Sequence, residues 1–225
     1  MSELSQIIDI SDDEDEGWID RDPARAPVIR RMKGFYFNHD YAIFETGGKD
    51  FSQFFLSEEL SDIKIKCEEE TYNCHKIILA SSSPVFKAML NYDMVEVTSG
   101  CINIENFKPK VVKFALEFIY KSYINVMEVR ENATFASDLL AIAEQYQLDE
   151  LKRMCEIELC SYGLGFDNAL NLLVLGDRFR APELKECALE LIVNMRREVF
   201  ENWGTKLVKF VKAYPELSAM IMKLL

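Results

Sequence analysis

The sequence predicts an α+β protein, with short strands and helices first and an all-α helical segment after them. Residues Ile63–Cys67 alternate apolar and charged side chains, as a half-buried strand does, and three acids separate them from a second strand over Thr71–His75. From Pro109 onward, apolar residues recur every three or four positions, the spacing of amphipathic helices. The chain has 225 residues and is 49% hydrophobic, which is enough to fill a large core.

Residues 1–27 are expected to be a disordered acidic tail, because acids and prolines dominate them. An apolar strip interrupts the tail, formed by Ile7, Ile8 and Ile10. It resembles a SUMO-interaction motif, in which the strip adds as a strand to a sheet edge and the acids of Asp12–Glu16 meet a basic rim. Ser11 lies between strip and acids, and it is a candidate phosphorylation site. The alternative is a solvated tail whose isoleucines bind nothing.

Residues 28–49 form a predicted linker or arm that packs on the following domain. Its aromatic residues are Phe35, Tyr36, Phe37, Tyr41 and Phe44. Stacking on nucleic-acid bases is the less favoured interpretation, since no basic field surrounds these side chains. The short basic patch Arg30–Lys33 is too small to be a nuclear import signal.

A short two-turn helix is predicted from Asp50 onward. It places Phe51, Phe54 and Phe55 on one face by the i, i+3, i+4 rule. Three phenylalanines on so short a helix exceed what a small core needs, so this face is a candidate contact with a second molecule. An ordinary core helix is the alternative.

Three elements change direction between Tyr72 and Leu90: a strand, one helical turn, and a second helix opened by Ser83 and Pro84. We expect the apolar side chains of the two helices to be buried, namely Ile77, Leu79, Val85, Phe86 and Met89. His75 has no identifiable catalytic partner and is interpreted as a structural residue.

This stretch resembles the signature of the BTB/POZ domain through Tyr72, His75, Lys76, Leu79, Ala80, Ser83, Phe86, Met89 and Leu90. Within that family the resemblance is greatest to the speckle-type POZ group, without its MATH domain. The resemblance implies a BTB/POZ fold over residues 50–162, a small mixed sheet flanked by helices. It implies a 3-box or BACK-like helical segment over residues 163–225. It also implies that the Phe51, Phe54 and Phe55 face is a homodimer interface.

The loop between Asn91 and Gly100 is longer than a simple connection requires, and such loops often carry function. Met94 and Glu96 resemble the hydrophobic-x-Glu motif with which BTB adaptors bind cullin-3. Methionine is an adaptable apolar contact residue. The remaining candidate cullin-binding residues are Leu90, Tyr92 and Tyr123. A cullin-independent loop is the alternative.

The helical half is divided by its caps and breakers. Asn132 is the predicted cap of a helix whose buried stripe is Phe135, Leu139, Ile142 and Tyr146. Asp149 is predicted to cap the next helix. An antiparallel pair is then expected over residues 168–179 and 182–195, joined by a short hinge. Two further helices, over residues 203–211 and 215–225, end in apolar residues that pack internally or against a second copy.

The net charge of −12 argues against nucleic-acid binding, which requires lysine and arginine to neutralise phosphates. No apolar run has the length of a membrane span or a signal peptide, so the six cysteines are read as free thiols in the nucleus, the cytoplasm or both. Zinc at Cys67, Cys74 and His75 is disfavoured, because that spacing lacks the close ligand pairs of structural zinc sites. We expect no metal, cofactor or catalytic residue.

The resemblance implies a non-catalytic, dimeric substrate adaptor of a cullin-3 RING ubiquitin ligase, with the tail recruiting SUMO or SUMO-modified targets. The alternative is a BTB scaffold that acts in transcription or chromatin regulation without a ligase. Residues 1–49 are too few for the MATH or Kelch domain with which adaptors bind substrates.

Overall fold

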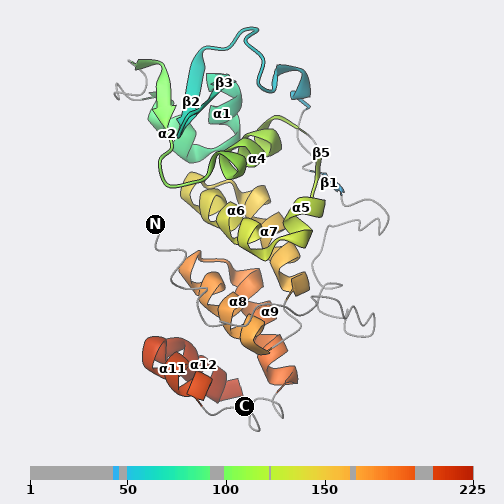
Figure 1. Ribbon diagram of the computed structural model, residues 1–225, viewed down its shortest axis with the longest axis vertical. Coiled ribbons are helices and arrows are strands. Elements are labelled where there is room, and N and C mark those ends of the chain that lie inside the picture. The colour runs from blue at the N-terminus through green and yellow to red at the C-terminus, as the bar shows by residue number, and fades with distance from the viewer. Residues whose placement is uncertain are drawn as a thin grey trace.

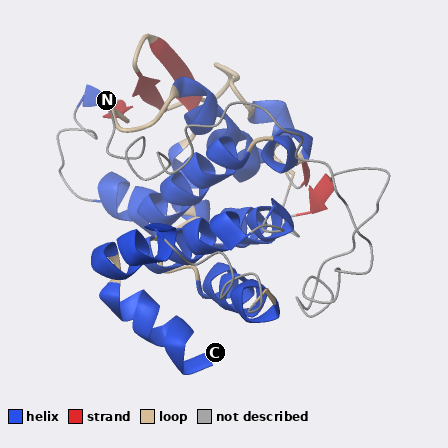
Figure 2. Cartoon of the chain, turned by 60° about the horizontal axis from the view of Figure 1, so that its bottom comes forward, coloured by secondary structure: helices blue, strands red, loops and turns tan. Residues whose placement is uncertain are grey.

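The computed structural model describes residues 43–45, 50–91, 99–121, 123–162, 166–195 and 205–224. The molecule is elongated (Figure 1), with a small sheet at one end, stacked helices in the middle and the last two helices at the other end. Seen from a second side (Figure 2), helices make up most of the described chain. This arrangement is the predicted one, a small mixed sheet flanked by helices and followed by a helical segment.

The larger sheet is mixed and has the strand order β3-β2-β4. Its strands are β2 (Ile63–Cys67), β3 (Glu70–Cys74) and β4 (Cys101–Asn103). β2 pairs antiparallel with β3 and parallel with β4. The predicted alternation is confirmed, because the three apolar residues of β2 are buried and its two lysines are exposed.

A second, two-stranded sheet pairs β1 (Ile43–Glu45) antiparallel with β5 (Tyr123–Asn125), so that Phe44 lies opposite Ile124. The end of the predicted arm therefore contacts the folded body through backbone hydrogen bonds.

The predicted two-turn helix after Asp50 is wrong in length, because only a 3₁₀ turn, η4 (Ser52–Phe54), forms there. The Asp50 carboxylate accepts a hydrogen bond from the Ser52 amide at 2.9 Å and starts the turn. Phe55 is extended and Leu56 has a φ of +57°, so the chain leaves helical geometry at once.

Helices α1 (Lys76–Ser82) and α2 (Pro84–Asn91) follow β3 as predicted. The expectation that Ile77 is buried is wrong: its exposed fraction is 78%, whereas Ile78 and Leu79 are buried. A two-turn helix that packs on the core through one side cannot bury three consecutive residues. Val85 and Met89 are half-buried against the core and Phe86 is fully buried.

The centre of the molecule consists of α4 (Pro109–Tyr120), α5 (Met127–Glu131), α6 (Ala133–Tyr146) and α7 (Asp149–Tyr162). The Asn132 cap is confirmed, since its side chain accepts a hydrogen bond from the Phe135 amide at 2.9 Å. The predicted stripe of α6 is buried throughout. Asp149, by contrast, lies within the first turn of α7.

The C-terminal helices are α8 (Phe166–Arg178), α9 (Pro182–Asn194), α11 (Thr205–Ala213) and α12 (Pro215–Leu224). α8 and α9 approach closely at Gly176, where an added Cβ would lie 2.9 Å from the Lys185 backbone nitrogen. α12 packs on α9 and α11, and its residues Leu217 and Ile221 are buried.

All six cysteines are free thiols, as predicted; five are buried and Cys101 is half-buried. Within the described residues, no helix combines the length and apolarity needed to cross a bilayer.

Candidate protein-interaction surface

A groove of about 820 Å³ opens where η4, α1, the end of α4 and the α6–α7 turn meet. Its apolar lining is Phe51, Phe54, Leu60, Ile77, Ile78, Pro84, Phe118, Ile119 and Leu148. Its charged lining residues are Asp62, Lys121, Asp149 and Glu150. The groove thus combines a mainly apolar lining with a few, mostly acidic, charged side chains, an arrangement that suits a protein partner.

Two large apolar side chains of the groove face solvent, Leu60 with an exposed fraction of 77% and Ile77 with 78%. Leu60 also has a φ of +59°, in the left-handed region that leucine rarely adopts. The hydrogen bond from the Ser61 amide to the Glu58 carbonyl, at 3.2 Å, closes the turn that contains it. Burying two such side chains against a partner would be worth about 1.5–3 kcal/mol each.

The three phenylalanines predicted to form a dimer face do not act alike. Phe51 and Phe54 line the groove, whereas Phe55 is not among its lining residues. The Phe55 ring instead lies 5.9 Å from the Tyr120 ring, with the Lys121 ammonium 5.4 Å from its centroid. The Phe51 amide donates to the Tyr120 carbonyl at 2.8 Å and fixes the start of η4 on α4.

His75 lies directly beneath this surface and supports it. Its ring contacts the Phe54 ring edge-on at a centroid distance of 5.5 Å. Its Nε2 lies 2.8 Å from the Glu59 carbonyl, which can only accept, so Nε2 carries the proton. Nδ1 therefore accepts from the Tyr120 hydroxyl at 2.9 Å. Because both ring nitrogens are engaged, His75 has a structural role.

The acidic side chains at the groove are hydrogen-bonded to the backbone or have pKa values that burial changes. Asp62 accepts a hydrogen bond from the Lys76 amide at 2.8 Å, at the first turn of α1. Burial raises the pKa of the Glu150 carboxyl, and the charge of Arg153 opposes that rise. Nearby, hydrogen bonds from Ser52 lower the pKa of Asp50.

The one histidine that lines the groove, His75, is buried, and both of its ring nitrogens are hydrogen-bonded within the protein. Across the described parts of the chain, no group of three or more potential ligand residues could hold a metal ion.

Most other predicted site residues fall outside the described ranges. This holds for Tyr92, Met94 and Glu96 in the loop, and for Ile7, Ile8, Ile10 and Ser11 in the tail. Leu90 is half-buried near the end of α2, immediately before that loop. Tyr123 lies in β5, opposite Glu45.

Sequence reasoning missed Leu60 and Ile77 as surface residues. For Ile77 a signal existed, because the run Ile77–Leu79 places three apolar residues in succession on one helix and one of them must point away from the core. For Leu60 no local pattern marks an exposed position.

Residues 51–162 match the family model described as BTB/POZ domain. Among curated proteins, the TD and POZ domain-containing protein 4 of Mus musculus is 32% identical over 170 residues, which are 76% of this chain and 44% of that protein. The TD and POZ domain-containing protein 2 of Mus musculus is 32% identical over 168 residues, 75% of this chain and 44% of that protein. The chain thus spans less than half the length of these relatives.

Two solved structures are similar to a part of this chain. The BTB domain of human gigaxonin has 26% identity and a TM-score of 0.38, covering 46% of this chain and 80% of that one. The BTB domain of zebrafish PATZ1 has 23% identity and a TM-score of 0.35, covering 43% of this chain and 72% of that one.

Proposed function

We propose, from the premise that this chain carries a BTB/POZ domain at residues 51–162, that it acts as a dimeric substrate adaptor of a cullin-3 RING ubiquitin ligase. BTB domains are generally non-catalytic modules that bind partner proteins and commonly form homodimers. An adaptor performs no chemistry; it raises the effective concentration of a substrate near the ubiquitin-loaded enzyme.

The observation that carries the dimer is the groove with Leu60 and Ile77 exposed at its edge. Both side chains are more than three-quarters exposed in the single chain, and a second copy would remove them from water. Phe51 and Phe54 extend this apolar surface. Phe55 contributes indirectly, by packing on Tyr120 beneath it.

The cullin-3 contact is proposed for the loop that follows α2. The proposed contact residues in the loop are Tyr92, Met94 and Glu96. Leu90, near the end of α2, and Tyr123, in β5, are proposed to border the contact. Support comes from the likeness of Met94 and Glu96 to the hydrophobic-x-Glu motif and from their position after α2 of a BTB domain. An apolar knob entering a pocket, fixed by a carboxylate, is a common form of anchored contact.

The test is the double variant Met94→Ala with Glu96→Ala. We expect it to lose cullin-3 binding in a calorimetric titration while remaining dimeric. The matched control, Met222→Ala with Glu216→Ala, removes an exposed methionine and glutamate from α12 and should bind as the wild type does. Wild-type dimers that do not bind cullin-3 would favour the alternative, a BTB scaffold in transcription or chromatin regulation.

The tail provides a proposed site for substrates. Ile7, Ile8 and Ile10 would add as a strand to SUMO, and phosphate on Ser11 would strengthen contact with its basic rim. Replacing the three isoleucines with alanine should abolish SUMO capture, and Ser11→Glu should increase it. An undiminished pulldown by the alanine variant removes this part of the proposal.

The proposed organisation is a tail over residues 1–27, an arm over 28–49, the BTB/POZ domain over 50–162 and a 3-box or partial BACK segment over 163–225. A protein of this kind would work in the nucleus, the cytoplasm or both.

A further inference from the structure

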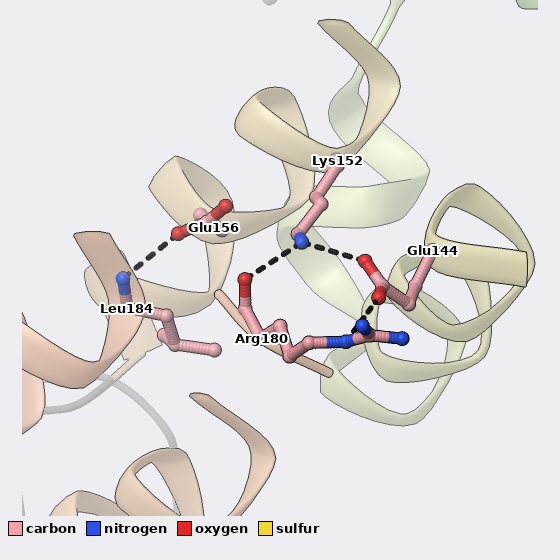
Figure 3. A network of polar contacts seen from close by, with 5 residues as sticks. All are labelled: Glu144, Lys152, Glu156, Arg180 and Leu184. Atoms are coloured by element: carbon pink, nitrogen blue, oxygen red, sulfur yellow. Dashed lines mark hydrogen bonds and ion pairs between the residues drawn. The ribbon is translucent and has the colours of Figure 1, made fainter. Parts of the chain in front are cut away.

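The turn between α8 and α9 is bonded at both of its ends by side chains of α7 (Figure 3). The Lys152 ammonium donates to the Arg180 carbonyl at 2.8 Å. One helical turn further along α7, the Glu156 carboxylate accepts a hydrogen bond from the Leu184 amide at 3.0 Å. The two side chains thus satisfy one acceptor after α8 and one donor in the first turn of α9.

The Glu156 contact replaces a missing helix cap. The residue at the N-cap position of α9 is Ala181, which has no side-chain acceptor. Leu184 is the third residue of α9, and the amides of a first helical turn have no partner within their own helix. A carboxylate at this position also complements the positive end of the helix dipole. Glu156 is only 2% exposed, so it caps α9 from within the core.

Lys152 performs the complementary task at the end of α8. Arg180 has a φ of +50°, and the Ala181 amide donates to the Gly176 carbonyl at 2.8 Å, which closes the end of α8. The Arg180 carbonyl then points to Lys152, whose ammonium is held by Glu144 of α6 at 2.7 Å. The Lys152 side chain is 15% exposed and that of Glu144 is 23% exposed.

We call Glu144, Lys152 and Glu156 the turn clamp. Arg180 also pairs with Glu144 through its Nε at 2.9 Å, but its side chain is 84% exposed. Solvent screens such a pair, and it contributes little. The buried Glu156 and the half-buried Lys152 and Glu144 therefore make the less exposed polar contacts between the α8–α9 turn and the helices α6 and α7.

We propose that the turn clamp makes the α8–α9 pair a rigid continuation of the BTB/POZ domain, so that both present one continuous surface to a partner. Lys152 and Glu156 are then positioning residues, which act on the partner through α8 and α9. The part of this inference that concerns cullin-3 rests on the proposed function, whereas the rigid attachment of α8–α9 is independent of it.

The test compares Glu156→Met with Glu156→Gln in the full chain. Methionine fills a similar volume without an acceptor, whereas glutamine keeps an oxygen for the Leu184 amide. In Glu156→Met we expect hydrogen exchange to be about tenfold faster in the α8–α9 turn and the first turn of α9, but unchanged in α6. Cullin-3 affinity should fall by about tenfold. Glu156→Gln should exchange no faster than the wild type and should keep its affinity, and so should the control Arg180→Gln.

Exchange that accelerates equally in α6 and α9, or not at all, overturns the turn clamp. Local acceleration with unchanged cullin-3 affinity overturns its role in partner binding. A wild-type chain that does not bind cullin-3 overturns the proposed function, and the exchange comparison then decides the rigid attachment alone.

Discussion

The Tyr120 hydroxyl lies 2.8 Å from the His75 amide nitrogen and 2.9 Å from His75 Nδ1. It accepts from the amide and donates to the ring, so one hydroxyl satisfies two buried groups at the junction of β3 and α1. His75 in turn contacts Phe54, and Tyr120 contacts Phe55. This pair therefore connects the core of the domain to the proposed dimer surface.

Replacing Tyr120 with phenylalanine should destabilise the protein strongly. The His75 amide and Nδ1 would both lose their partner in a region where His75 is 5% and Tyr120 1% exposed. Each buried polar group left without a partner costs about 1–3 kcal/mol. We expect urea denaturation to show an unfolding free energy lower by about 2–4 kcal/mol.

The control for this variant is Tyr72→Phe, which removes the same hydroxyl elsewhere in the fold. That hydroxyl donates to the Glu70 carboxylate at 2.5 Å and lies 3.0 Å from the Pro109 carbonyl oxygen. Glu70 is exposed, so water can take the place of the lost hydroxyl there. Loss of the hydroxyl should cost about 1 kcal/mol. Equal effects of the two substitutions would contradict the central role given to Tyr120.

The variant Ile77→Glu should be monomeric. Ile77 is 78% exposed in the single chain, so a charge there changes monomer stability by no more than about 0.5 kcal/mol. Within a dimer the charge would be buried in an apolar groove close to Asp62, Asp149 and Glu150. Sedimentation equilibrium measures the outcome. The control is Val208→Glu on α11; Val208 is 52% exposed and lies outside the groove lining, so this variant should remain dimeric. A dimeric Ile77→Glu would exclude this interface.

Alanine at Gly176 should destabilise the packing of α8 on α9. Its Cβ would lie 2.9 Å from the Lys185 backbone nitrogen, so the helices must separate. Overpacking of this kind costs about 1–3 kcal/mol, and the better helix propensity of alanine offsets about 1 kcal/mol of it. Thermal unfolding followed by circular dichroism should show a lower Tm. An unchanged or higher Tm would indicate that α8 and α9 adjust without loss of packing.

The stability difference between Glu156→Gln and the wild type should depend on pH. Burial raises the pKa of Glu156 above its ordinary value of 4.5, and the Leu184 amide opposes that rise. A raised carboxyl pKa means that the stability contributed by the protonated group is present at low pH and is lost as pH rises through the raised pKa. The glutamine variant does not titrate at this position. Its unfolding free energy, measured from denaturation curves, should therefore rise relative to that of the wild type as pH increases above 4.5. A difference that is constant with pH would contradict this.

Sequence patterns predicted the elements that depend on neighbouring residues. The alternation in β2, the Asn132 cap and the proline start of α4 each involve groups only a few positions apart. The length of η4 was not predictable in this way. Phenylalanines at helical spacing do not reveal that Leu56 adopts a left-handed conformation and ends the turn.

The sequence by itself determined the α+β class, the order of the helices and the BTB/POZ signature around His75, because each depends only on residue types and their local spacing. Tertiary structure decided which side chains remain exposed and which backbone groups at helix ends find a hydrogen-bond partner. Ile77 is exposed because α1 packs on the core through Ile78 and Leu79. α9 is capped by Glu156, 28 residues before Leu184, because α7 folds against it. Contacts between residues so far apart arise only once the helices have packed.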